Sequence, residues 1–136
     1  MNSSVILLVI LGAFYAVNAD LTDEQKQKIQ AYGKECVGET SVDTELIKKA
    51  RAGTFTDDAK LKAFVLCMSK KLGFQNNNGE IQTEVVRQKL GGALNDADAA
   101  NKLVEKCLVV KGSNEDTAFE SFKCYYESTP THLTVF

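Results

Sequence analysis

The stretch from Asp57 to Gly73 has every sequence signal of an amphipathic helix. It opens with two carboxylates, carries Lys70 and Lys71 in its last turn, and stops at a glycine. Its apolar residues recur at helical spacing, at Leu61, Phe64, Val65, Met68 and Leu72. Cys67 lies to one side of this stripe, so a disulfide there would leave the apolar face free to pack elsewhere. We therefore expect this helix to be the centre of the fold.

The N-terminus reads as a secretion signal. Residues 5–17 form an apolar run, and the small residues around Ala19 suit a signal peptidase. The run is too short to span a bilayer in the mature protein, and no second long apolar stretch follows. We predict a signal peptide over residues 1–19, one mature domain over residues 20–136, secretion into extracellular fluid, and no stable membrane insertion.

The charge pattern and the cysteine count bear on the binding partners and on the disulfides of the protein. The 16 basic and 18 acidic residues alternate along the predicted helices, which argues against a nucleic-acid partner. Four cysteines are an even number in a secreted chain and predict two disulfides. The cysteine count alone leaves all three possible pairings open.

The remaining segments also have helical patterns. A capping box at Thr22–Gln25 opens the first helix, Gly91 and Gly92 end the fourth, and Pro130 breaks the sixth. The first predicted helix starts at Thr22. The other five cover residues 43–52, 57–73, 83–90, 95–111 and 113–126. We predict an all-α fold, a compact bundle of six short helices around an apolar pocket and stapled by two disulfides.

The cysteine spacing and several short motifs resemble one known family. Thirty residues separate Cys36 from Cys67, thirty-nine separate Cys67 from Cys107, and sixteen separate Cys107 from Cys124. The matching motifs are Thr44-Glu45-Leu46-Ile47-Lys48-Lys49-Ala50-Arg51-Ala52-Gly53, Asp57-Asp58, Lys71-Leu72-Gly73-Phe74 and Asn78-Gly79-Glu80-Ile81. The chain is similar to the insect odorant-binding proteins, the pheromone and general odorant-binding family. Since Ala63 and Glu115 stand where that family usually has two further cysteines, it resembles the four-cysteine branch called Minus-C.

The resemblance implies a pairing and a function. The implied disulfides are Cys36–Cys67 and Cys107–Cys124, without the third bond that would have joined positions 63 and 115. The implied function is reversible carriage of odorants, pheromones or other small apolar molecules in an internal cavity. An olfactory role and a role in haemolymph or a glandular secretion both stay open, as do an odorant receptor and a homodimer as partners. A secreted, saposin-type protein that binds lipid surfaces is the alternative.

The pocket wall is predicted from the apolar faces of the later helices and from the tail. The candidates are Leu61, Val65, Met68, Leu72, Val86, Leu90, Leu103, Leu108, Phe119, Phe122, Tyr126, Leu133 and Phe136. Each has an ordinary alternative as a core residue, because periodicity identifies buried faces and does not separate a filled core from a cavity. The apolar tail either folds over the pocket mouth or stays loose, as chain ends often do.

Three polar side chains offer more specific roles. Tyr125 or Tyr126 could donate a hydrogen bond to an alcohol, aldehyde or ester, although two tyrosines at the protein surface are the more common arrangement. His132, the sole histidine, could release ligand on acidification, but the sequence supplies no buried partner for it. We favour the surface tyrosines and an exposed histidine without a role.

Catalytic, metal and cofactor sites are not expected. The thiols are expected to be oxidised, and no phosphate loop, nucleophile elbow or paired metal-binding histidines occur. The turn at Phe74–Glu80 looks like a calcium loop, but Phe74 and Val85 stand where the ion needs carboxylates. We therefore predict no enzyme, no metal and no cofactor.

Overall fold

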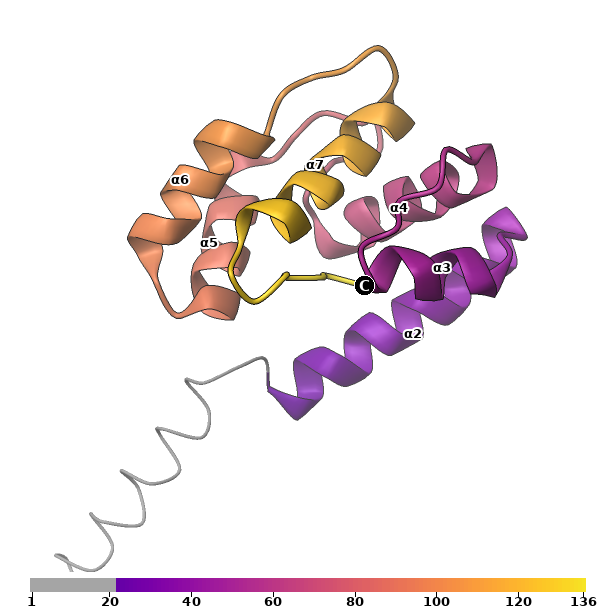
Figure 1. Ribbon diagram of the computed structural model, residues 1–136, viewed down its shortest axis with the longest axis horizontal. Coiled ribbons are helices and arrows are strands. Elements are labelled where there is room, and N and C mark those ends of the chain that lie inside the picture. Colours follow the sequence, from indigo (N-terminus) through magenta and orange to yellow (C-terminus); the bar gives the residue numbers. More distant parts are fainter. Residues whose placement is uncertain (1–21) are drawn as a thin grey trace, which may run out of the picture.

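A computed structural model of the protein describes residues 22–136 (Figure 1). Within that part of the chain lie the helices α2 (Asp23–Thr40), α3 (Thr44–Arg51), α4 (Ala59–Leu72), α5 (Thr83–Leu94), α6 (Ala97–Cys107) and α7 (Asn114–Ser128). Residues 22–136 contain no strand, only one isolated bridge between Gln75 and Ile81. The all-α prediction is confirmed. The predicted signal peptide lies outside the described residues.

The local helix signals act as the sequence predicts. Thr22 and Gln25 form a reciprocal capping box, each side chain bonding the backbone N–H of the other at 3.1 and 2.9 Å. The Asp58 carboxylate accepts the Leu61 N–H at 2.8 Å and so caps α4. At the other end of α4, Gly73 has φ 81°, a left-handed conformation that glycine adopts without strain.

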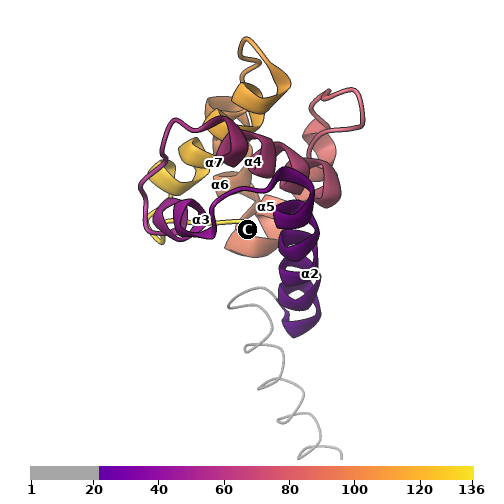
Figure 2. The same cartoon turned by 90° about the vertical axis from the view of Figure 1, so that its right-hand side faces the viewer.

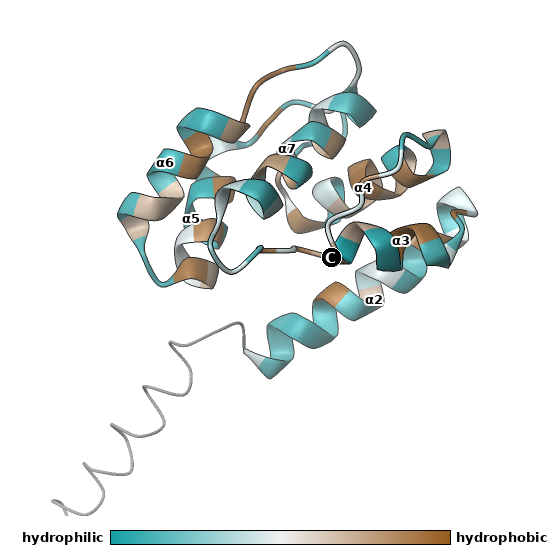
Figure 3. Ribbon diagram, viewed as in Figure 1, coloured by the Kyte–Doolittle hydropathy of each residue, from teal (hydrophilic) through white to brown (hydrophobic). Residues whose placement is uncertain are grey.

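Helix α4 is the centre of the bundle. It packs against α2 and α7, while α5 and α6 pack side by side and α6 also meets α7 (Figures 1 and 2). The buried residues of α4 are Leu61, Phe64, Val65, Leu66, Met68, Ser69 and Leu72. Hydrophobic segments occur on α4 and on the helices around it, whereas much of α2 is hydrophilic (Figure 3). No helix in residues 22–136 is long and apolar enough to cross a membrane.

Helix α5 is longer than predicted. The expected end at Leu90 is wrong, because the helix runs through Gly91 and Gly92 to Leu94 and is closed by Asn95 at φ 52°. Leu94 is partly buried against the core, and this contact opposes the cost of about 1 kcal/mol for each glycine in a helix. A short turn at Asn95 and Asp96 then lets α6 fold back along α5.

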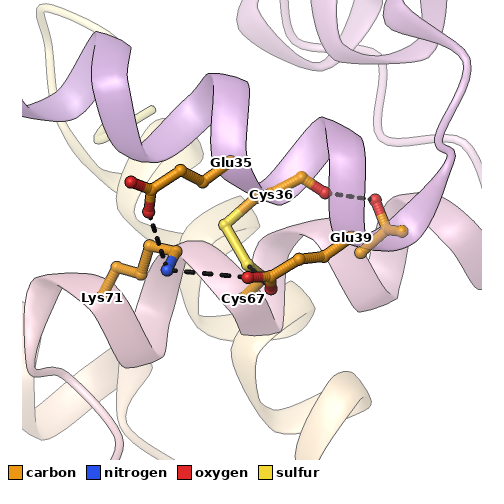
Figure 4. Close-up of polar contacts among 6 residues, drawn as sticks. Glu35, Cys36, Glu39, Cys67 and Lys71 are labelled. Carbon is orange, nitrogen blue, oxygen red and sulfur yellow. Dashed lines mark hydrogen bonds and ion pairs between the residues drawn. A yellow bond between two sulfur atoms is a disulfide. The ribbon is translucent and has the colours of Figure 1, made fainter.

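The two disulfides have the pairing that the family resemblance implies. Cys36–Cys67 joins α2 to α4, and Cys107–Cys124 joins α6 to α7. Beside the first bond, Lys71 reaches Glu35 at 2.9 Å and Glu39 at 3.8 Å (Figure 4). Its hydrogen bond to Glu35 raises the pKa of the Lys71 ammonium. The disulfide and this ion cluster together hold the C-terminal half of α2 on α4.

The C-terminal tail is packed into the protein. Val135 and Phe136 are buried, and Leu133 is half-buried. The Phe136 ring meets Phe64 edge to face and Phe122 in a stacked arrangement. Arg51 on α3 donates its Nε–H to the backbone oxygen of Phe136 at 3.1 Å. Of the two readings that the sequence left open for the tail, the loose chain end is wrong.

Candidate ligand-binding site

A cavity of about 270 Å³ lies between the N-terminal half of α2, the C-terminal half of α5 and the tail. Its apolar wall consists of Ile29, Tyr32, Leu72, Phe74, Leu90, Ala93 and Val135. Its polar rim includes the exposed side chains of Gln25, Lys28, Gln88 and Lys89. An apolar interior with a polar, solvent-exposed rim suits a small hydrophobic molecule that enters from water.

The cavity follows from how the elements meet. Ile29 and Tyr32 are three residues apart and therefore share one face of α2, opposite Leu90 and Ala93, which are spaced in the same way on α5. Cys36 is the only buried residue of α2, so the helix is held at its C-terminal half while its N-terminal half extends away (Figures 1 and 2). The space between the two helices is the cavity.

The predicted wall residues are divided among four environments. Leu72 and Leu90 line the cavity. Leu108 and Phe122 line a separate void of about 10 Å³. Tyr126 and Leu133 are half-buried. The other candidates are buried in the core and are not among the residues lining the 270 Å³ cavity: Leu61, Val65, Met68, Val86, Leu103, Phe119 and Phe136.

The two adjacent tyrosines lie in different surroundings. Tyr125 is 1% exposed, and its hydroxyl has no hydrogen-bond partner among the described residues. Tyr126 is half-buried, and its ring meets Phe55 edge to face. The favoured prediction, that both lie at the surface with hydroxyls in water, is therefore wrong for Tyr125.

His132 stays at the surface. Its ring stacks on Tyr126 with centroids 4.7 Å apart, and its Nδ1 lies 3.1 Å from the Tyr126 carbonyl oxygen. Within residues 22–136, His132 forms no salt bridge with a carboxylate. The structure thus gives this histidine a packing partner and no acidic one.

Several lining residues were not among the wall candidates. Ile29 and Tyr32 lie on one face of the first helix, but nothing in the sequence indicates that this face borders a space. Ala93 follows the two glycines that were expected to end its helix. Phe74 follows the glycine that ends α4, and the chain reversal at Gly73 turns it back toward the core, where it is 3% exposed.

One group of residues has the spacing of a metal site. The ligand atoms of Cys36, Glu39 and Cys67 lie within 4.8 Å of one another. Both cysteines are joined in a disulfide, so neither offers the thiolate that a metal would need. With its two sulfurs oxidised, this group leaves one carboxylate and does not suit a metal ion.

Comparison with known proteins places the chain in a family. The PBP/GOBP family matches residues 18–128. The B2 protein of Tenebrio molitor is 39% identical over 127 residues, covering 93% of this chain and 94% of the relative. General odorant-binding protein 56a of Drosophila melanogaster is 33% identical over 135 residues, covering 96% of each. The solved structure of "Fatty acid binding protein OBP56a from the oral disk of the blowfly Phormia regina" superposes with a TM-score of 0.65 at 30% identity, covering 80% of this chain and 95% of that one.

The disulfides agree with these matches. All four cysteines are paired, as in the four-cysteine Minus-C branch. The saposin-type alternative is not favoured, because the relatives are odorant-binding proteins and match this chain over nearly its whole length. The chain belongs to the PBP/GOBP family of insect odorant-binding proteins and is a carrier of small hydrophobic ligands.

Proposed function

We propose that the protein holds one small hydrophobic molecule in the cavity between α2 and α5 and carries it reversibly through extracellular fluid. The observation that supports this most is the cavity itself, about 270 Å³ with an apolar wall and a polar rim. That volume suits a compact volatile or a single alkyl chain, slightly below the usual range for drug-sized ligands. The signal peptide expected over residues 1–19 and membership of the family support secretion.

The way α2 is attached supports reversible loading. The C-terminal half of α2 is fixed by the Cys36–Cys67 bond and by the ion pairs of Lys71. Residues 23–28 are exposed and contribute no buried apolar side chain. A helix end with so little buried area can open at low cost, so ligand exchange would proceed by motion of this end.

Fatty acids belong in the set of ligands to be tested. The blowfly relative is described as a fatty acid binding protein and is 30% identical to this chain. Lys28 and Lys89 at the cavity rim could face a carboxylate while the alkyl chain fills the apolar interior. Binding here requires no catalytic step. The partners proposed for the ligand-bound protein are a second copy of the chain and an odorant receptor. Size-exclusion chromatography with and without ligand tests for the second copy.

The test is titration with the apolar fluorescent probe N-phenylnaphthylamine, followed by competition with alcohols, aldehydes, esters, terpenes and fatty acids. We expect saturable one-to-one binding. Ala93→Trp fills the cavity and should weaken binding about tenfold or more, a loss of roughly 1.4 kcal/mol. The matched control is Ala97→Trp, at an exposed position of α6. Equal probe affinity in the two variants would contradict the proposed site.

A further inference from the structure

Tyr125 is a buried phenol without a hydrogen-bond partner. Its side chain is 1% exposed, and within residues 22–136 its hydroxyl is the one buried side-chain polar atom left unpaired. The Tyr125 ring packs against two other aromatic rings. Its centroid lies 6.4 Å from that of Phe74 and 5.8 Å from that of Phe122. A buried hydroxyl in native proteins is nearly always bonded to protein, water or ligand, so this one calls for a partner.

The partner has a space of defined size. Tyr125 lines a void of about 10 Å³ together with Ser69, Gln75 and Ser121. This is about the volume that one oxygen-sized probe needs, the size of a water or of a single hydroxyl group. The void therefore admits the polar end of a ligand and nothing larger.

The hydrogen atoms of the other polar groups around this void are already used. Ser69 donates its hydroxyl hydrogen to Gln75 at 2.7 Å, and Ser121 donates to the Thr117 carbonyl at 2.7 Å. The Gln75 amide donates to the Gly79 carbonyl at 3.0 Å. Each serine oxygen keeps lone-pair capacity, whereas the Tyr125 O–H is an unused donor.

The polarity of the void thus matches a hydroxyl. An incoming alcohol accepts a hydrogen bond from Tyr125 and can donate its own hydrogen to a serine oxygen. An ether can only accept, and a hydrocarbon does neither. Burial raises the pKa of the Tyr125 phenol above its ordinary value, so it stays protonated and remains a donor at neutral pH. A charged carboxylate would be costly to bury here, because no cation lines the void.

Phe74 connects this void to the proposed binding site. Its ring belongs to the wall of the 270 Å³ cavity and also to the wall of the void. Turning that ring aside would join the two spaces, with the apolar part of a ligand in the cavity and its oxygen at Tyr125. The cavity would then bind the apolar part of the ligand, and the void would bind its hydroxyl group.

We propose that Tyr125 is a specificity-determining residue that selects small apolar ligands bearing a terminal hydroxyl group, by donating a hydrogen bond from the void behind Phe74. This inference rests on the proposed function, since it needs a ligand in the neighbouring cavity. It adds a ligand class, primary alcohols, and a residue that recognises them.

The experiment compares three competitors of equal chain length, nonanol, octyl methyl ether and decane, against bound N-phenylnaphthylamine. In the wild-type protein nonanol should compete about tenfold better than decane, the difference that one net hydrogen bond makes, with the ether between them. Tyr125→Phe should abolish this preference and leave the affinity for decane unchanged. The control Tyr126→Phe, which removes the neighbouring hydroxyl, should keep it.

The outcomes separate the two proposals. Equal competition by nonanol and decane in the wild-type protein, with the probe still bound one-to-one, means that the void holds only a resident water and overturns the role of Tyr125. A preference for nonanol that survives Tyr125→Phe overturns it too, because the hydroxyl is then bound elsewhere. Absence of saturable probe binding in the folded wild-type protein contradicts the proposed function, and this inference falls with it.

Discussion

The ring of Phe136 stacks on the ring of Phe122, with centroids 5.8 Å apart and planes inclined by 17°. One residue belongs to the tail and the other to α7, so the end of the described chain is part of the hydrophobic core. Phe64 on α4 meets the Phe136 ring edge to face, with centroids 5.7 Å apart. The tail therefore contributes to folding stability as well as to the wall of the cavity through Val135.

Phe136→Ala is expected to lower the free energy of unfolding by about 3 kcal/mol, because it removes a buried aromatic ring and leaves a cavity. Urea unfolding followed by circular dichroism measures the change. Val110→Ala, at a side chain that is 76% exposed, is the control and should change stability by less than about 0.5 kcal/mol. A loss no larger in Phe136→Ala than in the control would show that the tail is not packed in solution.

An ion cluster joins α4 to α7 next to the two positions where six-cysteine relatives have a further disulfide. Lys62 precedes Ala63 and lies 3.0 Å from Asp116, which follows Glu115. Lys62 also lies 2.8 Å from Asp57 and over the ring of Phe119. The hydrogen bond from Lys62 lowers the pKa of the Asp116 carboxyl. Charged Asp116 therefore stabilises the fold above the ordinary aspartate pKa of about 4, and this stabilisation is lost as the pH falls through the lowered pKa.

Lys62→Met should therefore lower the melting temperature at pH 7, and the difference from wild type should be smaller at pH 2, because uptake of a proton by Asp116 removes its ion pair with Lys62. Differential scanning calorimetry at the two pH values measures this. Lys60→Met changes an exposed lysine on the same helix and should have little effect at either pH. A melting-temperature difference that is the same at both pH values would count against the ion cluster as the link between α4 and α7.

The disulfides should contribute similar amounts. In the loop-entropy account, bonds that close 31 and 17 residues differ little, since the effect grows with the logarithm of loop length. We expect the double variants Cys36→Ala/Cys67→Ala and Cys107→Ala/Cys124→Ala each to lose about 3 kcal/mol in chemical unfolding. An unfolding midpoint that either double variant shares with the wild type would contradict this expectation.

Ligand release is not expected to depend on His132. The ring is exposed and stacked on Tyr126, and it lacks an acidic partner within the described part of the chain. His132→Ala should therefore show the same ratio of ligand affinities at pH 7 and pH 5 as the wild type. Fluorescence titration at both pH values checks this, and a ratio that changes in the variant would restore the histidine as a switch.

Local signals in the sequence were sufficient for most of the helices. Asp58 and Gly73 cap α4 because each acts on backbone groups a few residues away, which a sequence pattern can represent. The end of α5 was not predicted because the contact of partly buried Leu94 with the core is a long-range contact, which the local glycine signal does not contain. The cysteine pairing likewise needed the family resemblance, since spacing alone left three choices.

The cavity could not be located from periodicity. Leu61 and Val65 have the same apolar pattern as Leu72 and are fully buried in the core, whereas Leu72 borders the space beside α2. That difference depends on the angle at which α2 leaves the bundle, and no single helix pattern contains it. Tyr125 and Tyr126 are neighbours in the sequence, but a helix turns by about 100° per residue, which places one inside and one at the boundary.

The proposed ligand site lies between α2 and α5. The most direct measurement is nuclear Overhauser contacts between a bound alkyl ligand and the methyl groups of the isotopically labelled, oxidised protein. We expect contacts from ligand protons to Ile29, Leu90, Ala93 and Val135, which share the wall of the cavity. Contacts confined to methyl groups that do not line this cavity would contradict the proposed site.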